Sequence, residues 1–202
     1  MDRMRSLPLI LASASPRRAE ILRRAGFRFR ILPTSVDESP RRRESPARHV
    51  VRLAREKAFA AALRVRGPAI IIGADTVVVA RRQILGKPAS RAGARRMLRL
   101  LSGRTHRVLT GLAVLRLVQP VGMNRRTRVG FLHSAIEETR VMFSPLTGRQ
   151  IAAYVATREP MGKAGAYAIQ GRAGKFVTRI EGCYFNVVGL PLARLCRMLR
   201  SL

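Results

Sequence analysis

The sequence predicts an α/β fold with a mixed β-sheet, and three observations support this prediction. Strand patterns and helix patterns alternate through the first half of the chain, whereas several strand patterns follow one another directly in the second half. Direct succession of strands favours antiparallel pairs beside parallel ones. The 202 residues, 47% of them hydrophobic, are sufficient to bury a core in one large domain or in two closely joined lobes.

The first strand and the first helix are predicted near the N-terminus. Residues 7–12 are apolar and indicate a buried strand that continues into Ser13-Ala14-Ser15. Pro16 is typical of a first helical turn, so a helix is expected from Pro16 to Gly26 with Ser15 as its N-cap. The local pattern is therefore strand, polar turn and helix.

The next elements surround a polar loop. Residues 27–31 alternate apolar side chains with arginine, the period of a half-buried strand. A polar, proline-containing loop covers residues 34–44, and an Ala-rich helix is expected over residues 45–65. Residues 69–80 are rich in β-branched side chains and predict a buried strand, followed by a turn or hairpin at residues 83–88.

The second half contains fewer helices between its strands. Ser90 is expected to cap a helix that ends at Leu101. Strands are predicted at residues 104–118 and 134–143, joined by a basic connection at residues 119–130 that is a candidate for a variable loop. A helix, a glycine-rich stretch, a strand and an amphipathic closing helix are expected at residues 147–157, 162–174, 176–188 and 190–202.

Cysteine usage and apolar segments exclude several protein classes. Cys183 and Cys196 form no C-x-x-C pair and the three histidines are scattered singly, so neither a disulfide framework nor a zinc site is expected. Arg3 and Arg5 before the apolar residues 7–11 imitate a signal peptide, but this apolar run is shorter than the about 7–15 residues required. No segment approaches the ~20 apolar residues of a membrane span. We therefore expect a cytoplasmic protein with no membrane partner.

The net charge of +29 does not by itself indicate a nucleic-acid partner. The basic residues are spread along the whole chain, aromatic residues are only 5%, and no RNA-binding signature occurs. A composition bias toward arginine explains the charge, although non-specific polyanion binding is expected at low salt. The rare lysines stand out, because a lysine is a compact point charge whose pKa can be tuned. They are Lys57, Lys87, Lys163 and Lys175.

The polar turn after the first strand is a candidate phosphate site. The segment Ser13-Ala14-Ser15-Pro16-Arg17-Arg18 combines hydroxyls, the amides of a helix start and the guanidiniums of Arg17 and Arg18. Such a group of donors suits a triphosphate tail. The alternative is a capped helix with solvated arginines, since Arg-Arg pairs recur along the chain.

Asp75 is the candidate catalytic acid. In Gly73-Ala74-Asp75-Thr76 a carboxylate follows an Ile-Ile-Ile run, at what is expected to be the end of a strand, where α/β proteins place their sites. Desolvation raises the energy of the ionised form, so a buried Asp requires a cation, a metal or hydrogen-bond donors around it. The alternative is a structural Asp that caps a turn.

Other charged groups could complete such a site. Glu38, or its neighbour Asp37, could supply a second oxygen ligand, because Mg²⁺ is commonly held by one or two carboxylates together with phosphates and waters. Lys57 on the predicted helix and Lys87 in the turn Gly86-Lys87-Pro88 could each place an ammonium against a phosphate. The alternatives are an ordinary loop acid and an ordinary ion pair on a helix surface.

The glycine-rich stretch is a candidate binding segment. Its small residues allow close approach of the backbone to a ligand. Gln170 within it carries an amide that both donates and accepts, as the reading of a base edge requires. The alternative is a glycine-rich hairpin with no ligand.

Taken in order, these segments resemble the signature strings of the Maf family of nucleotide pyrophosphatases. The resemblance covers nearly the whole chain, and seven strings in sequence are far more specific than any one of them. The strings are S-A-S-P-R-R at 13, R-L-A-R-E-K-A at 52, G-A-D-T-V-V at 73, L-G-K-P at 85, S-G-R-T-H at 102, E-P-M-G-K-A-G-A-Y-A-I-Q-G at 159 and N-V-V-G-L-P-L at 186.

The resemblance implies a single Maf-like domain over residues 1–202, with an elongated mixed sheet flanked by helices in two lobes around a central cleft, as in Maf and ITPase-like proteins. It implies hydrolysis of a nucleoside triphosphate to the monophosphate and pyrophosphate. A divalent cation, Mg²⁺ or Mn²⁺, and a homodimer are implied as well. The expected role is house-cleaning of dTTP, UTP or modified pyrimidine nucleotides.

Site residues follow from the same resemblance. Asp75 matches the acid assigned as general base, and Glu38 with Asp75 would hold the metal. Positions that mark the branch acting on dTTP and UTP are matched by Arg17, Thr76 and Gln170. The residues that would line the phosphate and metal site are Ser13, Arg18, Glu38, Lys57 and Lys87.

A protein of another class is the alternative. The basic surface could serve a nucleic-acid-binding or cell-division regulatory protein, a role linked to the same family as inhibition of septum formation. Two departures from the family pattern are Gly162, where many relatives carry Asp, and the exceptional arginine content. Pyrophosphate release from a nucleotide panel, compared with polynucleotide affinity at two salt concentrations, separates the two functions.

Overall fold

A computed structural model describes residues 7–118 and 128–202 and divides into two compact units. Unit 1 consists of Met1–Asp75, Gly111–Ile136 and Gly189–Leu202, and unit 2 of Thr76–Thr110 and Glu137–Val188. Neither unit is one continuous segment of the chain. Residues 119–127 of the candidate variable loop, and the arginines at positions 3 and 5, lie outside the described residues.

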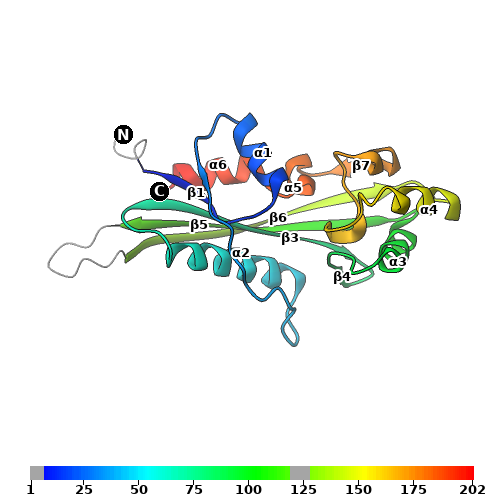
Figure 1. The fold of residues 1–202 in the computed structure, drawn as a ribbon, viewed down its shortest axis with the longest axis horizontal. Coiled ribbons are helices and arrows are strands. Elements are labelled where there is room, and N and C mark those ends of the chain that lie inside the picture. The colour runs from blue at the N-terminus through cyan, green and yellow to red at the C-terminus, as the bar shows by residue number, and fades with distance from the viewer. Residues whose placement is uncertain (1–6, 119–127) are drawn as a thin grey trace. The chain divides into compact units, whose positions relative to one another are not determined.

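The described residues form the predicted succession of strands and helices (Figure 1). The strands are β1 (Leu9–Leu11), β2 (Arg30–Ile31), β3 (Ala69–Ala80), β4 (Gln83–Leu85), β5 (Thr105–Val118), β6 (Arg128–Phe143) and β7 (Val177–Glu181). The α-helices are α1 (Pro16–Arg24), α2 (Pro46–Ala62), α3 (Arg91–Leu101), α4 (Gly148–Ala156), α5 (Tyr184–Val188) and α6 (Leu192–Arg200). The 3₁₀ helices η2 (Ala164–Ala166) and η3 (Arg172–Phe176) occupy the glycine-rich stretch and its end.

The sheet is mixed, which confirms the predicted fold class. Strand β1 pairs in parallel with β2 and with β3, where Leu11 stands opposite Ile72. Strand β3 pairs antiparallel with β4, and β6 pairs antiparallel with β7. The strand order is β2-β1-β3-β5-β6-β7, with β4 paired to β3.

In unit 1, helix α2 packs directly against the sheet (Figure 1). Ala54 and Ala58 of this helix are fully buried. A side chain at Gly73 of β3 would collide with the carbonyl of Ala54, and a side chain at Gly111 of β5 would collide with the backbone of α2. These small residues let the backbone of α2 approach the backbones of β3 and β5 closely, so that other side chains of the helix can contact side chains of the strands.

In unit 2, aromatic rings gather in one core. Phe143 packs edge to face against His106, Tyr167 and Phe176, with ring centroids 4.9–6.2 Å apart. Tyr154 of α4 completes the cluster against Phe176 at 5.3 Å. Edge-to-face pairs of this kind add to the stabilisation from burial alone, so the few aromatic residues of the chain stabilise chiefly this unit.

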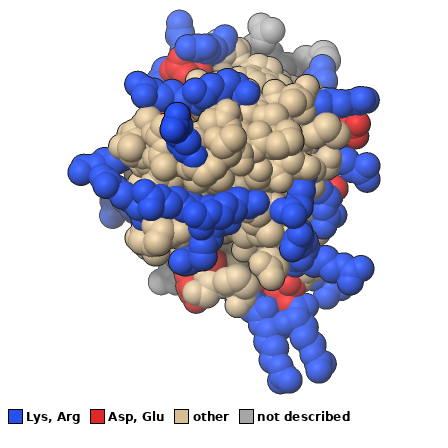
Figure 2. All heavy atoms as spheres, turned by 90° about the vertical axis from the view of Figure 1, so that its right-hand side faces the viewer, with Lys and Arg blue, Asp and Glu red and all other residues tan. Residues whose placement is uncertain are grey.

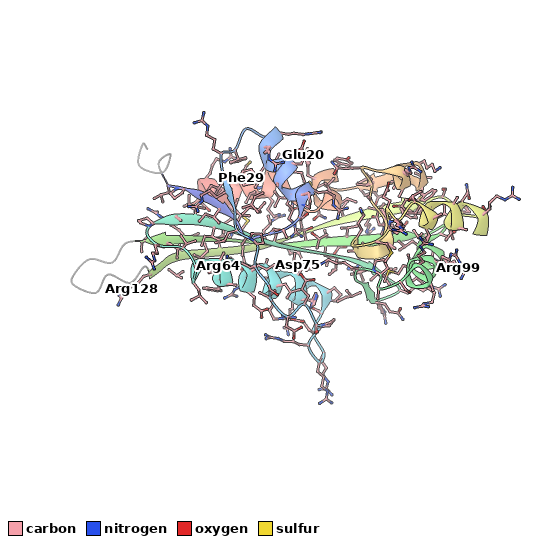
Figure 3. All side chains as sticks on the ribbon, in the orientation of Figure 1. Glu20, Phe29, Arg64, Asp75, Arg99 and Arg128 are labelled. Atoms are coloured by element: carbon pink, nitrogen blue, oxygen red, sulfur yellow. The ribbon has the colours of Figure 1, made fainter. Side chains whose placement is uncertain are left out.

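Strand β3 does not end at Asp75, so the expectation that Asp75 stands at a strand terminus is wrong. The strand continues to Ala80, and Asp75 lies near its middle (Figure 3). The reason is a change of pairing partner along β3. Ile70 to Ile72 pair with β1 and Val78 to Ala80 pair with β4, so Asp75 lies between the two pairings.

Other boundaries differ from the sequence-based expectations. The expected strand at residues 176–188 contains the short strand β7 and then helix α5. Strand β2 has only two residues within the expected range 27–31, and β6 begins at Arg128, before the expected start at residue 134. Helix α2 ends at Ala62, three residues early. Apolar content alone does not locate such boundaries.

Side-chain caps begin three of the helices. The side chains of Ser45, Ser90 and Thr147 each accept a hydrogen bond from the backbone amide three residues later, and Thr147 belongs to a full capping box. Ser15 occupies the N-cap position of α1 without such a bond. Its backbone amide donates instead to Ser13 Oγ at 3.2 Å.

The surface shows the basic character of the sequence. Figure 2 faces the side of α3 and α4, and on it lysine and arginine greatly outnumber aspartate and glutamate. Both cysteines are free thiols. Within residues 7–118 and 128–202, no helix has the length and apolar character needed to cross a membrane.

Candidate active site

Two acids and one lysine of unit 1 form a cluster that we call the Lys57 centre. Lys57 Nζ donates hydrogen bonds to Asp75 Oδ1 at 2.6 Å and to Glu38 Oε1 at 2.7 Å. Lys57 and Asp75 are each 7% exposed, whereas the Glu38 side chain is 44% exposed. The centre is therefore buried on the side of Asp75 and open to solvent on the side of Glu38.

The position of Lys57 follows from the helical period and from the small residues around it. Residues 54, 57 and 58 lie on one face of α2, and Ala54 and Ala58 touch the backbone at Gly73. Asp75 is two residues beyond Gly73, so its side chain leaves β3 on the same face. The close packing of α2 on β3 brings the ammonium to the carboxylate.

A second network, which we call the Arg52 clamp, holds the loop that carries Glu38. Arg52 Nε and Nη2 donate to the two carboxylate oxygens of Glu44 at 2.6 and 2.8 Å, and Nη2 also donates to the Ser39 carbonyl at 3.1 Å. His49 Nδ1 lies 3.0 Å from Glu44 Oε2. Because Ser39 directly follows Glu38 in the loop, the Arg52 clamp holds the backbone next to Glu38 against helix α2.

Arg52 and Glu44 of the Arg52 clamp stay ionised over most of the pH range. Hydrogen bonds from Arg52 hold the pKa of Glu44 well below its usual range, and those bonds raise the pKa of Arg52. Arg52 and Glu44 are not among the site residues predicted from the sequence. The available signal was the presence of Arg52 in the R-L-A-R-E-K-A string, on the helical turn before Lys57.

Arg18 connects the polar turn to the strand that carries Asp75. Its Nη1 donates to Ser13 Oγ at 3.0 Å and to the Ala74 carbonyl at 2.8 Å, and its Nε donates to the Gly189 carbonyl at 2.8 Å. Burial lowers the pKa of Arg18 from its ordinary value, and the charge of Asp75 opposes this effect. Arg18 thus positions Ser13 and the backbone next to Asp75. Its predicted contact with a phosphate stays a prediction.

The remaining predicted residues are Arg17 of unit 1 and Thr76, Lys87 and Gln170 of unit 2. Arg17 is partly exposed on α1 of unit 1. Thr76, Lys87 and Gln170 belong to unit 2, where Lys87 and Gln170 are exposed in loops. Thr76 Oγ1 lies 2.9 Å from Thr110 Oγ1. Contact of these residues with a substrate stays a prediction.

Within unit 2, the turn of Lys87 and the glycine-rich stretch meet. The amide of Gly165 donates to the carbonyl of Gly86 at 3.1 Å. Gly165 has a φ of 68°, and a side chain there would collide with Val78. The stretch is built of turns and 3₁₀ helices, so the glycine-rich hairpin considered from the sequence is wrong.

The carboxylates of the Lys57 centre fit a hard divalent cation. Glu38 and Asp75 oxygens share one ammonium, which brings two oxygen ligands close together. Asp37, the other candidate, instead accepts from the Ser39 amide at 2.9 Å. The described residues contain no group of three or more His, Cys, Asp or Glu side chains that could hold a metal. Two carboxylates suffice for Mg²⁺ when phosphates and waters supply the other ligands.

Comparison with known proteins identifies close relatives. The Maf family, described as Maf-like protein, matches residues 8–202. A dTTP/UTP pyrophosphatase of Pelotomaculum thermopropionicum is 50% identical over 193 residues, which cover 96% of this chain and 95% of that protein. One of Symbiobacterium thermophilum is 51% identical over 95% of this chain and 92% of that protein, and one of Vibrio cholerae is 47% identical over 91% and 92%.

A distant likeness to a solved structure, the Staphylococcus aureus Ham1 protein, has a TM-score of 0.42 and 13% identity, and covers 96% of this chain and 98% of that chain. The curated relatives are much more similar in sequence, at 47–51% identity over more than nine-tenths of the chain, and the family match extends from residue 8 to residue 202. The chain belongs to the Maf family of Maf-like proteins.

Proposed function

We propose that this chain is a nucleoside-triphosphate pyrophosphatase that hydrolyses dTTP and UTP to the nucleoside monophosphate and pyrophosphate. Relatives with 47–51% identity over more than nine-tenths of the chain are dTTP/UTP pyrophosphatases, which supports this function. The proposal extends to modified pyrimidine nucleotides, as a house-cleaning role. The alternative of a nucleic-acid-binding or septum regulatory protein is not favoured by these relatives.

The Lys57 centre is the observation that carries the proposal. Burial of a lysine and an aspartate costs desolvation free energy, and a buried ion pair stabilises a fold little compared with well-packed apolar residues. A role in catalysis explains why the charged side chains of Lys57 and Asp75 are buried at this position. The opening on the side of Glu38 gives water and a phosphate access to the carboxylates.

The proposed step is an attack of water on the α-phosphorus. A new bond forms between the water oxygen and this phosphorus, the bond from it to the oxygen bridging to the β-phosphorus breaks, and pyrophosphate leaves with the bonding electron pair. Asp75 Oδ2 accepts the proton of the water, while Oδ1 stays bonded to Lys57 Nζ. Lys57 thereby orients the base, and Arg17 offsets negative charge on the departing group.

A divalent cation is part of the proposal. Glu38 and Asp75 would hold Mg²⁺ or Mn²⁺, which when bound neutralises charge on the triphosphate. Lys87 is proposed as a phosphate contact and Thr76 with Gln170 as specificity residues. The Arg52 clamp and Arg18 keep the backbone on either side of the carboxylates in place.

The direct test is pyrophosphate release from a panel of dTTP, UTP, dCTP, GTP and ATP with Mg²⁺ or Mn²⁺. We expect turnover of dTTP and UTP, and Asp75→Asn should reduce the rate by about 10³-fold or more because it removes the base, with nucleotide affinity nearly unchanged. Asp37→Asn is the matched control and should leave the rate within about twofold. A rate above one-tenth of wild type in Asp75→Asn would remove Asp75 from the role of base.

Base selection is tested at Gln170. Gln170→Glu exchanges an amide that donates and accepts for a group that only accepts, so we expect the ratio of kcat/KM for dTTP over GTP to fall about tenfold. Gln150→Glu makes the same chemical change in the first turn of α4 and serves as the control. An unchanged ratio in Gln170→Glu would exclude this residue from base reading.

We also propose a homodimer in the cytoplasm. Apolar surface near the C-terminal end of α2 supports a second copy as partner, since Phe59 is 38% exposed and Leu63 is 89% exposed. Two free cysteines suit a reducing compartment. Light scattering after size exclusion should give twice the 22.4 kDa mass of the chain, and a mass of one chain would contradict the dimer.

A further inference from the structure

Unit 2 contains an open cavity that none of the candidate active-site residues lines. Its volume is about 490 Å³, and it is formed by the β3–β4 turn, the start of β5, the end of β6 and strand β7. Sites for small molecules commonly have about 300–1,000 Å³. Val79, Met142 and the ring of His106 supply uncharged surface to the cavity. The His106 ring is neutral near pH 7 because burial lowers its pKa to about 4. The cavity is large enough for a nucleotide-sized molecule.

Guanidinium groups dominate the lining, so we call this the arginine cavity. Unit 2 has eight arginines in Thr76–Thr110 and five in Glu137–Val188, thirteen in all. Five of the thirteen line this one cavity, and they are Arg81, Arg82, Arg107, Arg140 and Arg179. Their mutual repulsion disfavours an empty cavity and favours an anion in it.

Carboxylates neutralise only part of this charge. Arg107 Nη1 lies 3.3 Å from Glu138 Oε2, and Arg179 Nε lies 3.1 Å from Glu181 Oε1. Among the described residues, Arg81, Arg82 and Arg140 form no ion pair. Three guanidiniums are therefore available for a ligand, and each can bind a phosphate through two parallel hydrogen bonds.

The turn that carries two of these arginines is unfavourable for them. Arg81 and Arg82 connect β3 to β4 and have φ values of 47° and 63°. Such two-residue hairpin turns favour Asn-Gly, because positive φ costs a residue with a Cβ atom about 1 kcal/mol or more. Strained backbone is often kept at functional sites, and here it directs two guanidiniums to one end of the hairpin.

We propose that the arginine cavity binds a phosphate-bearing small molecule of nucleotide size, at a site separate in sequence from the Lys57 centre. Arg81, Arg82 and Arg140 bind the phosphates, and the apolar surface of Val79 and Met142 accepts the uncharged part of the molecule. The proposal goes beyond the hydrolytic function and does not depend on it. Asp75→Asn should therefore bind this ligand as the wild type does.

The test follows the methyl group of Met142 by NMR in methionine-labelled full-length protein. Inorganic tripolyphosphate, and in a second titration ATP without metal, are added at about 150 mM salt, where weak non-specific binding is suppressed. We expect a saturable shift of the Met142 signal with both probes. Met198, which lies in unit 1 and does not line the cavity, is the internal control.

The decisive variant is Arg81→Asn with Arg82→Gly, which removes two guanidiniums and installs the residues that this turn favours. We expect its Tm to be unchanged or higher and its affinity for tripolyphosphate to fall at least tenfold. Arg95→Gln with Arg99→Gln on α3 removes the same charge outside the cavity and should change the affinity less than twofold. Equal losses in the two double variants, or a Met142 signal that does not move with either probe, would each overturn the proposal.

Discussion

The two units bury polar groups of different kinds. Among the described residues of unit 1, the buried polar side chains all carry charge or contact a charge, and they are Ser13, Arg18, His49, Lys57 and Asp75. Those in unit 2 are neutral, and they are His106, Thr110, Thr139 and Asn186. Neutral groups need only matched hydrogen bonds, whereas buried ions need a counter-charge and still lose solvation. The contrast separates the neutral polar groups that stabilise the fold of unit 2 from the charged groups that we propose take part in catalysis in unit 1.

The neutral network of unit 2 shows what a purely structural solution looks like. Asn186 Nδ2 donates to the Val108 carbonyl and to Thr139 Oγ1, both at 2.9 Å. The Cys183 amide also donates to Thr139 Oγ1, at 3.1 Å. These bonds attach α5 and the turn before it to β5 and β6, and no ionised side chain takes part. Nothing in this network resembles the solvent-open carboxylates of the Lys57 centre.

Of the changes to stability that compare the two units, the largest is expected from removing the charge of Lys57. In Lys57→Met the side chain keeps its length but leaves Asp75 buried without its partner, so unfolding free energy should fall by about 3 kcal/mol or more. Pyrophosphate release should fall by about 10²–10³-fold, because the carboxylates lose their orientation. Rate measurements and urea unfolding check both values.

The control for this variant is Lys175→Met in unit 2. Lys175 is exposed and lies 5.8 Å from the centroid of the Phe176 ring, without a buried counter-ion. We expect its unfolding free energy to change by less than about 0.5 kcal/mol and its rate to stay the same. If both lysine variants behaved alike, the distinction between the two units would fail.

The sequence predicted which residues form the Lys57 centre better than it predicted where these residues lie in the strands and helices. Scarcity of lysine pointed to Lys57, and the Ile-Ile-Ile run pointed to Asp75, because both signals are local. The position of Asp75 in mid-strand was missed, since the change of partner from β1 to β4 depends on which strands pair, and the sequence does not state this. The Arg52 clamp was missed because it joins residues that look like ordinary surface charges.

The error at residues 176–188 has a similar origin. The apolar run of α5 reads as a strand by composition, because Tyr, Phe and Val favour strands. The buried hydrogen bonds of Asn186 override this local preference, since they hold the residue to strands β5 and β6. Tertiary contacts of this kind cannot be seen in a window of sequence. The alternation of strands and helices, which is local, was predicted correctly.

The next effect is the pH dependence of the free energy of unfolding. It distinguishes the two units because His106 of unit 2 and Glu44 of unit 1 titrate in different pH ranges. Burial lowers the pKa of His106 to about 4, below its ordinary value of about 6.5. Between these values the unfolded chain binds a proton that the folded chain does not, so stability falls as pH falls from about 6.5 to about 4. The contribution of His106 to the free energy of unfolding, measured in urea, should be about 2 kcal/mol lower at pH 5 than at pH 7.

His106→Phe isolates this contribution. Phenylalanine can keep the ring contacts with Phe143 and Tyr167 but does not titrate, so the loss between pH 7 and pH 5 should shrink to a small fraction. The pKa of Glu44 in unit 1 is lowered from its ordinary value of 4.5, so its stabilisation is present above about pH 4.5 and is lost only below that value. A loss of equal size in His106→Phe would assign the titration to another group.

The third test probes the packing that brings the Lys57 centre together. A methyl group in Gly73→Ala would meet the Ala54 carbonyl and the Ala58 amide, both backbone atoms, so α2 must shift away from β3 at a cost of about 1–3 kcal/mol. Because Lys57 lies on the same face of α2, the rate of pyrophosphate release should fall together with stability. Gly148→Ala, at a position with open space around it, should preserve both. A Gly73→Ala enzyme with lowered stability and full activity would show that the centre tolerates displacement of its helix, and that close packing serves the fold of unit 1 alone.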